Sequence, residues 1–266
     1  MKFITLSGKK IEMRKVHLTP QIIFSLFWGK KEKIKYAFSF DYKNLALTAL
    51  TSLKNPGKLL TFAGLNFYKG TYLWKGEVNS SKKTQKVLVA NAGVYSPDTA
   101  IGTEILCFLG ANYLIKVGCC GSLRKDIKIG ELVIANQILD DTGVTKFYPA
   151  RIKIDRKLNE KIQQSLSKFK IHKGKVWSYD ALFREEKSIV RERIEKGAIA
   201  VDMSLASFFK VASFYEKKAG SVLVVSDNLI TGEIGFRSEL FRQKLSQLIK
   251  NIFKVLEIIE LQETIS

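Results

Sequence analysis

Histidine and cysteine are scarce in this sequence, and their scarcity excludes several kinds of catalytic site. There are two histidines, His17 and His172, which argues against Ser/His or Cys/His nucleophilic catalysis because both need a histidine base. The three cysteines, of which Cys119 and Cys120 are adjacent, do not form a disulfide framework, and no Cys/His spacing matches a zinc site. We therefore expect no metal and a reducing, cytoplasmic compartment.

Long hydrophobic runs are also absent. No apolar run reaches the roughly 20 residues needed to cross a bilayer, and the apolar patch at the N-terminus stops at Ser7 and Gly8, which makes a poor signal peptide. We expect no membrane partner. The sequence shows no internal repeat and no clear linker, and 266 residues suffice for one large α/β domain with a sizeable core.

Acidic residues are outnumbered, and the formal net charge is +19. A charge of this size can mark a nucleic-acid-binding protein. Here the lysines are scattered along the whole chain, with no arginine-rich tract and no interleaved aromatic platform. We therefore attribute the charge first to solvated surface and second to phosphate-bearing ligands, and we rank nucleic acid third.

The stretch from Leu114 to Ala135, LIKVGCCGSLRKDIKIGELVIA, is the centre of the pattern. It predicts a buried strand, a tight glycine-flanked loop at Gly118–Gly121, and a returning strand after Gly130. Glycines allow the backbone to approach a ligand and to present N–H groups to an anion, and Lys116 would add positive charge. The alternative is a strand that ends in a glycine turn, with both cysteines buried as small apolar residues.

Apolar and amphipathic segments alternate along the rest of the chain, and the first 60 residues are the least readable. The segment 86–118 predicts a βαβ unit and so a parallel part of the sheet. Near the N-terminus we predict a helix at 45–53, a turn at 55–57 and a hairpin over 67–78. Further strands are predicted at 175–177, 198–201 and 222–226, and further helices at 158–169, 185–196, 205–215 and 238–261.

Every candidate polar group lies just after a predicted strand. Because the carboxyl ends of strands in α/β sheets are where ligands bind, we expect these groups to form one site. They are Gly93, Gly118–Gly121, Phe183, Asp202–Ser204 and Asp227-Asn228.

Four segments resemble one family. KVLVANAGVYSPDTAIGTEIL is similar to the glycine-rich segment of the nucleoside phosphorylase superfamily, which contains purine nucleoside and uridine phosphorylases and related nucleosidases. IKVGCCGSLRKDIKIGELVIA resembles its phosphate-site segment, and AVDMSLASFFKVA with VLVVSDN resembles its ribose- and base-site segments. The order and spacing agree over residues 60–235.

The resemblance implies a fold and an activity. The fold would be a single α/β domain over residues 1–266, divergent over 1–60, of the phosphorylase/hydrolase-like type, with a mixed central β-sheet flanked by helices. Such proteins usually form homo-oligomers, either dimers or hexamers. The reaction would be cleavage of the N-glycosidic bond of a nucleoside by phosphate, giving free base and ribose 1-phosphate. Inorganic phosphate would be the co-substrate, with no other cofactor.

The resemblance also assigns roles to single residues. Asp227 would be the general acid, or the hydrogen-bond partner, for the leaving base. Phosphate would be bound by Gly93, Lys116, Gly118 and Cys119. The nucleoside would be bound by Phe183 (or its neighbour Leu182), Asp202, Met203, Ser204 and Asn228.

The chain departs from the family pattern at three of these positions. Lys116 replaces an arginine and so lacks the bidentate fork, and Cys119 replaces a serine or threonine and is a weak donor. Ser204 replaces the glutamate that grips the ribose hydroxyls. The Gln-x-Arg pair that reads uracil is not visible, which favours a purine. Three functions stay open: a purine nucleoside phosphorylase, a hydrolytic nucleosidase, and a catalytically weakened nucleoside- or nucleotide-binding protein.

Overall fold

The computed structural model describes residues 3–6, 9–12, 34–61, 72–80 and 83–263. The chain divides into two compact units, Met1–Glu32 and Lys33–Ser266. The first contains an antiparallel pair, β1 (Phe3–Leu6) and β2 (Lys9–Glu12). That residues 1–266 form one domain stays a prediction.

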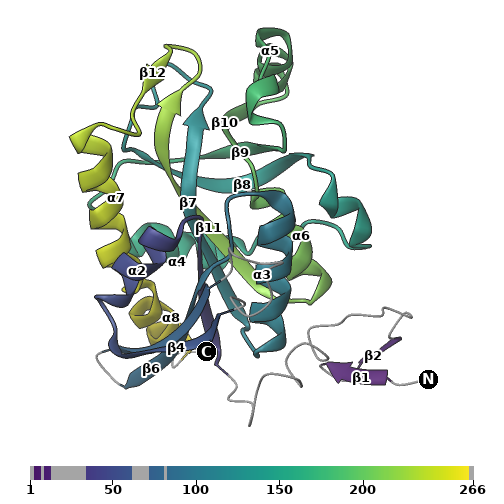
Figure 1. Cartoon of the computed structure of the whole chain (residues 1–266), viewed down its shortest axis with the longest axis vertical. Helices are drawn as coiled ribbons and strands as arrows, with labels where there is room; N and C mark the ends of the chain where they lie inside the picture. The colour runs from purple at the N-terminus through teal and green to yellow at the C-terminus, as the bar shows by residue number, and fades with distance from the viewer. Residues whose placement is uncertain (1–2, 7–8, 13–33, 62–71, 81–82, 264–266) are drawn as a thin grey trace. The chain divides into compact units, whose positions relative to one another are not determined.

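A ten-stranded mixed sheet forms the centre of the second unit (Figure 1). Its order is β12-β11-β8-β9-β10-β7-β3-β6-β5-β4, and β11 also pairs with β7, which closes five of the strands into a small barrel. This confirms the predicted mixed α/β sheet. The bounds are β3 (Tyr36–Phe40), β4 (Lys54–Thr61), β5 (Tyr72–Asn79), β6 (Thr84–Asn91), β7 (Tyr113–Ser122), β8 (Leu132–Asp141), β9 (Ile171–Tyr179), β10 (Ala198–Asp202), β11 (Lys218–Asn228) and β12 (Glu233–Ile234).

Helices flank this sheet, with α3 and α6 side by side and the C-terminal helices on the other side of the unit (Figure 1). Among the described residues, none of the helices has the length and apolar character of a membrane span. The helices are α2 (Lys43–Leu50), α3 (Ser96–Phe108), α4 (Arg156–Ser165), α5 (Lys187–Glu195), α6 (Leu205–Phe214), α7 (Glu239–Ile252) and α8 (Val255–Glu263), with 3-10 turns η2 (Val144–Phe147) and η3 (Leu182–Arg184).

The βαβ unit β6–α3–β7 is present, and its strands run parallel as predicted. A strand that the sequence analysis did not identify, β3, lies between them and pairs in parallel with both. The residue after β3 is Asp41. Its backbone N–H donates to the Val117 carbonyl at 3.3 Å, so the β3 end is fixed directly beside the centre of β7.

The prediction of a loop at Gly118–Gly121 is wrong, because β7 runs through these residues without a break. Neither glycine has a positive φ. Their role is to leave space: a Cβ on Gly118 would lie 2.1 Å from Oδ2 of Asp41. The glycine therefore admits a carboxylate from the neighbouring strand into the space that a side chain would fill.

Two other local predictions need correction. The predicted turn at 55–57 lies inside β4, where the register with β5 shifts and Asn55 has a φ of 48°. The predicted helix over 238–261 is two helices, α7 and α8, separated at Phe253 and Lys254. Of the predicted hairpin over 67–78, residues 67–71 lie outside the described residues, and the remainder forms β5.

Candidate active site

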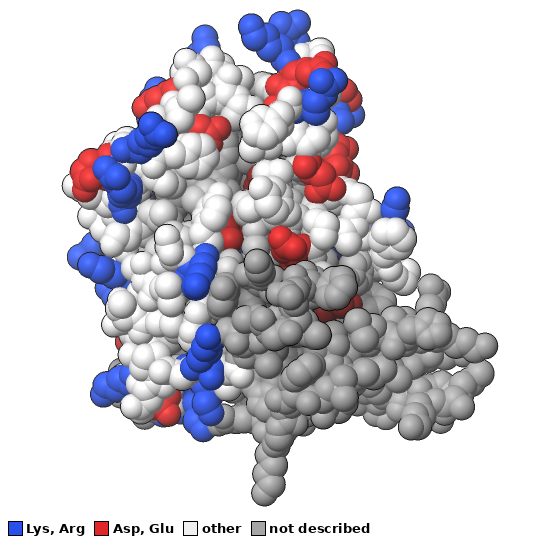
Figure 2. Space-filling view, in the orientation of Figure 1, with Lys and Arg blue, Asp and Glu red and all other residues white. Residues whose placement is uncertain are grey.

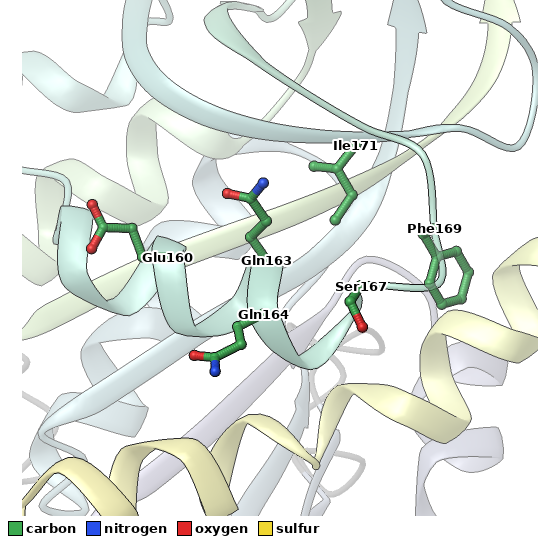
Figure 3. A pocket seen from close by; sticks show the side chains of 6 residues that line it. All are labelled: Glu160, Gln163, Gln164, Ser167, Phe169 and Ile171. Carbon is green, nitrogen blue, oxygen red and sulfur yellow. The ribbon is translucent and has the colours of Figure 1, made fainter.

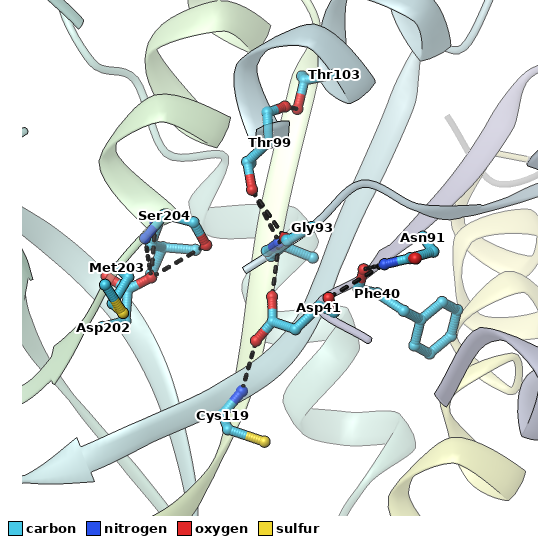
Figure 4. A network of polar contacts seen from close by, with 12 residues as sticks. Phe40, Asp41, Asn91, Gly93, Thr99, Thr103, Cys119, Asp202, Met203 and Ser204 are labelled. Carbon is cyan, nitrogen blue, oxygen red and sulfur yellow. Dashed lines mark hydrogen bonds and ion pairs between the residues drawn. The ribbon is translucent and has the colours of Figure 1, made fainter. Parts of the chain in front are cut away.

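Contacts between distant segments bring most of the predicted site residues together (Figure 4). Lys116 on β7 donates from Nζ to the Gly93 carbonyl, just after β6, at 3.0 Å. Ser96 at the start of α3 donates from Oγ to the Met203 carbonyl at 2.7 Å. Asp227 on β11 pairs in register with Gly121 on β7. The ends of β6, β10 and β11 thus meet around the glycine segment of β7.

Asp41 is the centre of the polar network, and the sequence analysis missed it. Its Oδ1 forms an ion pair with Lys116 Nζ at 2.7 Å, and its Oδ2 accepts from the Cys119 backbone N–H at 2.9 Å. The Lys116 side chain is 0 % exposed and that of Asp41 is 3 % exposed. The signal available in the sequence was an aspartate directly after the apolar run YAFSF, within the least readable region.

This network uses the donors that the sequence assigned to phosphate. Besides Asp41, Lys116 Nζ contacts the Gly93 carbonyl and the Thr99 hydroxyl, at 3.0 and 3.4 Å. An ammonium group has three N–H donors, and here each has a partner within the protein. That Lys116 and Cys119 bind phosphate stays a prediction, and it now requires that Asp41 moves away or shares these donors.

Gly93 connects β6 to α3 in a conformation that favours glycine. Its φ is +83°, and a Cβ there would lie 2.5 Å from Cβ of Asp98. The Thr99 hydroxyl donates to the Gly93 carbonyl at 2.9 Å, which holds the loop against the first turn of α3. Burial raises the pKa of Asp98, and nearby Lys116 lowers it.

Asp202 caps the N-terminus of α6. Its Oδ2 accepts from the backbone N–H groups of Ser204 and Leu205 at 2.8 and 2.6 Å, and its Oδ1 accepts from the Ser178 hydroxyl at 2.5 Å. Burial raises the pKa of Asp202 to about 6, although these hydrogen bonds oppose the shift. Both carboxylate oxygens therefore have partners within the protein. Neither is free to bind a substrate in the way predicted for Asp202.

Ser204 lies beneath this cap. It is 2 % exposed, and its Oγ is 3.5 Å from Oδ2 of Asp202, so it faces the cap. Met203 lies between these two buried residues and is half-buried. Of the three residues in the predicted ribose segment, Met203 is the one whose exposure suits a ligand contact.

Asp227 lies half-buried near the end of β11. A Cβ on Gly121 would be 2.9 Å from its Oδ2, and the Ser226 hydroxyl donates to its Oδ1 at 2.7 Å. Burial raises the pKa of Asp227, and the hydrogen bond from Ser226 opposes that shift. A carboxyl group with a raised pKa can hold a proton nearer neutral pH, as a general acid must.

Glu185, which the sequence analysis did not single out, is electrostatically coupled to Asp227. It follows η3 and is half-buried. Burial, and then the charge of Asp227, raise its pKa to about 7. In the sequence it stands in the charged run REEK, which gives no sign that one glutamate is set apart.

The contacts of Asn228 do not support its predicted substrate role. Its Nδ2 donates to the carbonyls of Arg124 and Ile127, at 2.9 and 3.1 Å. Its Oδ1 accepts from the backbone N–H groups of Ile230 and Thr231, at 2.9 and 3.0 Å. The side chain is buried, so Asn228 fixes two loops to each other instead.

Exposed aromatic side chains occur on segments that also carry site residues. Phe183, predicted to bind the nucleoside, is 94 % exposed on η3, and its neighbour Leu182 is 48 % exposed. Tyr42 and Tyr95 are also exposed and were not predicted. Tyr42 directly follows Asp41 in the chain. Partial burial raises its pKa, and the charges of Cys119, Asp41, Tyr95 and Asp227 add to the effect in that order.

Other features of the described residues do not compete with this site. A hollow of about 480 Å³ lies beside the start of β9, and Figure 3 shows the side chains around it. Ser178 is at the opposite end of that strand. The hollow is lined by Glu160, Gln163, Gln164, Ser167, Phe169 and Ile171. Within the described ranges, no three His, Cys, Asp or Glu side chains are grouped to hold a metal ion. Figure 2 shows Asp and Glu both in the middle of the described surface and near its edges, where they lie among Lys and Arg.

Comparison with known proteins identifies similar chains. Residues 38–259 match the family described as the phosphorylase superfamily. A DeoD-type purine nucleoside phosphorylase of Mycoplasma genitalium is 28 % identical over 193 residues, which cover 69 % of this chain and 79 % of the relative. The protein of the same name from Caldanaerobacter subterraneus is 31 % identical over 171 residues, or 61 % of this chain and 72 % of the relative.

Solved structures show the same fold. Uridine phosphorylase from Vibrio fischeri superimposes with a TM-score of 0.72 at 18 % identity, covering 88 % of this chain and 98 % of the other. Purine nucleoside phosphorylase from Toxoplasma gondii, in complex with immucillin-H, gives a TM-score of 0.76 at 16 % identity, covering 95 % and 99 %.

Proposed function

The chain belongs to the phosphorylase superfamily, and from that membership we propose that it cleaves the N-glycosidic bond of a purine nucleoside and releases the free base. The names of the similar DeoD-type chains support a purine. The absence of a visible Gln-x-Arg pair in the sequence also favours a purine over uracil.

The observation that carries this proposal is the position and environment of Asp227. Breaking the bond builds negative charge on the departing base and positive charge on the sugar, so an acid beside the base lowers the barrier. Asp227 is half-buried near the end of β11, and its pKa is raised by burial. Glu185, coupled to it, has a pKa of about 7, so the pair can retain one proton near neutral pH.

The remaining contacts to the nucleoside follow from exposure. Met203 would pack on the sugar, and Phe183 would cover the base with its exposed ring. Asp202 and Ser204 would support Met203 through the cap of α6. The family pattern has a glutamate where this chain has Ser204. We expect weaker binding of the ribose hydroxyls without that carboxylate, because charge-assisted hydrogen bonds contribute about 1.5–3 kcal/mol each.

The acceptor of the ribosyl group is either phosphate or water. Inorganic phosphate, without another cofactor, is the acceptor that the names of the relatives favour, and its product would be ribose 1-phosphate. Water is the second candidate, and the buried ion pair between Lys116 and Asp41 favours it. A catalytically weakened nucleoside-binding protein is the reading that remains if no base is released.

The test is a panel of adenosine, inosine, guanosine and uridine, assayed for released base by chromatography with and without phosphate. We expect release of base from at least one purine nucleoside. The Asp227→Asn enzyme is the matched control and should release much less base. Release from uridine alone would contradict the choice of base. No release from any nucleoside by folded protein would contradict cleavage itself.

Location and assembly are further parts of the proposal. We propose a cytoplasmic enzyme of purine salvage, supported by the three cysteines, all of which are free. We also propose a homo-oligomer, as the family resemblance implies. Sedimentation of the purified protein would test this, and a strictly monomeric species at assay concentration would contradict it.

A further inference from the structure

Residues 182–195 contain η3 and then α5, and we call this segment the arm (Figure 1). Phe183 and Glu185 lie near its start, and Arg193 lies near its end. Resting on the proposed cleavage of a nucleoside, we propose that Arg193 is a positioning residue: its pair with Asp141 fixes the arm, so that Phe183 and Glu185 lie where the base binds. Arg193 acts through the arm and does not touch the nucleoside.

Arg193 joins the arm to the ends of two strands. Its Nε donates to Oδ2 of Asp141, the last residue of β8, at 2.6 Å. The indole Nε1 of Trp177, on β9, donates to the same oxygen at 2.7 Å. The guanidinium carbon lies 5.7 Å from the centre of that indole ring, which allows a cation–π attraction. One carboxylate oxygen therefore fixes both the arm and the buried tryptophan.

The apolar contacts of the arm do not fix its orientation. Val190 of α5 is buried in a cluster that includes Trp177, and two isoleucines of α5 pack against that cluster. Hydrophobic burial is non-directional, so these side chains hold the helix near the sheet but allow it to turn or slide. A hydrogen bond weakens steeply when its angle changes. Arg193 therefore supplies the directional contact that sets how α5 lies.

The apolar cluster beneath the arm borders Asp227. Val201 belongs to the cluster, and Leu229 packs against it. A Cβ on Gly121 would lie 3.1 Å from Cγ1 of Val201, 2.6 Å from Cδ1 of Leu229 and 2.9 Å from Oδ2 of Asp227. These three side chains therefore surround one point of β7. The apolar support of the arm is thus next to the acid proposed to serve the base.

The start of the arm is also coupled to Asp227. Glu185 is half-buried, and the charge of Asp227 acts on it. α5 has nine residues and is about 13 Å long, so a tilt of about 10° at Arg193 would move its first residue by about 2 Å. Misplacing a contacting group by about 1 Å can lower a rate about 10²-fold. Loss of the Arg193 contact should therefore affect the reaction at the base.

The first experiment compares the kinetics of Arg193→Gln and Arg191→Gln. Both remove one positive charge from α5, but Arg191 is exposed, whereas the Arg193 side chain is 16 % exposed and paired. We expect Arg193→Gln to lower kcat/KM for a purine nucleoside at least about tenfold, and Arg191→Gln to behave like wild type. Glu185 should also lose the burial that raises its pKa to about 7, so a limb of the pH–rate profile near that pH should move to lower pH.

The second experiment measures the arm without catalysis, by hydrogen–deuterium exchange of its amides and mass spectrometry. We expect α5 to exchange at least about tenfold faster in Arg193→Gln than in wild type, because a charge-assisted hydrogen bond no longer opposes local opening. Exchange in α3 should not change. The arm of Arg191→Gln should exchange as in wild type.

Asp141→Asn tests the same pair from the strand side. The amide oxygen can still accept from Trp177, but the charge that holds Arg193 is gone. We expect this variant to reproduce the kinetics and the exchange of Arg193→Gln. The double variant should then add little to either single change, since both remove one contact.

Two results would refute the inference. One is an Arg193→Gln protein whose arm exchanges as slowly as that of wild type. The other is a faster-exchanging arm with wild-type kcat/KM and an unshifted pH–rate profile. If Arg193→Gln does not fold, Asp141→Asn provides the same test with the arm sequence intact. If wild type cleaves no nucleoside, the proposed function fails, whereas the exchange measurement still decides whether Arg193 fixes the arm.

Discussion

Gly118→Ala is the substitution that most directly tests how β7 and Asp41 fit together. The new methyl group would lie 2.1 Å from Oδ2, 2.6 Å from Cγ and 2.8 Å from Oδ1 of Asp41. All three distances are below any ordinary van der Waals contact. Since β7 is hydrogen-bonded on both sides, we expect the carboxylate to move and the strand to stay.

The cost of that movement follows from the contacts of Asp41. Displacing the carboxylate breaks the ion pair with Lys116 and the hydrogen bond from Cys119 N–H. Lys116 is 0 % exposed and would be left as an unpaired buried cation. Breaking a buried pair by removing one partner costs about 3–5 kcal/mol. We therefore expect Gly118→Ala to lower the free energy of unfolding by about 3 kcal/mol or more.

Urea denaturation followed by circular dichroism measures this change. Gly57→Ala is the matched control, because a Cβ on Gly57 would have no heavy atom within 4 Å and its φ is not positive. We expect the control to stay within about 0.5 kcal/mol of wild type.

A double-mutant cycle then assigns the cause. If the methyl group acts through Asp41, the cost of Gly118→Ala should largely disappear in an Asp41→Ala background. A Gly118→Ala protein as stable as wild type would refute the reasoning, as would a cost that is unchanged when the Asp41 carboxylate is already absent.

Three further predictions concern single polar groups. Asp227→Asn should lower turnover by about 10²-fold or more, as expected for a lost general acid, with an unchanged circular dichroism spectrum; full activity would remove Asp227 from the mechanism. The pKa of Asp202 is raised to about 6 in the folded state. The free energy of unfolding should therefore decrease by roughly 1–3 kcal/mol as the pH rises from about 4 to about 6. Asp202→Asn should flatten that fall in urea titrations at each pH, and an unchanged slope would contradict the assigned pKa. Asn228→Ala should destabilise by about 2–4 kcal/mol through four lost hydrogen bonds, and a change below about 0.5 kcal/mol in the same assay would contradict its structural role.

Apolar patterning predicted those parts of the fold whose cause is local. The βαβ unit over 86–118 and the strand over 198–201 correspond closely to β6–α3–β7 and to β10. Each is an apolar or amphipathic run bounded by glycine or a polar residue, so the pattern and the structure have the same origin. Gly110 follows the last turn of α3 with a φ of +99°, a conformation that favours glycine at a helix end.

The glycine segment of β7 could not be interpreted from local sequence. Glycine favours turns and also permits close approach by another chain segment, and only the second applies to Gly118. The approaching group, Asp41, is 78 residues away from Cys119 in the chain. A local sequence pattern cannot indicate a contact between residues so far apart in the chain. The continuation of β7 through Gly118 and the carboxylate beside it were therefore not predicted.

The candidate site shows the same limit. The sequence located Asp227, Met203 and Gly93 at strand ends that the structure brings together. It did not show that Asp202 caps a helix or that Asn228 joins two loops. Both roles depend on hydrogen bonds between the side chain and residues elsewhere in the structure. The residue type and its position after a strand predict where a side chain lies. Its role depends on how many of its hydrogen-bond donors and acceptors have no partner within the protein.

The position of β3 between β6 and β7 has a consequence for folding during synthesis on the ribosome. β3 is synthesised well before either of its neighbours, so both of its edges wait unpaired, and an open strand edge is a template for association with other chains. The sheet cannot close across its middle until residues up to 122 have emerged. Removing β3 would not trim an edge; it would divide the sheet in two.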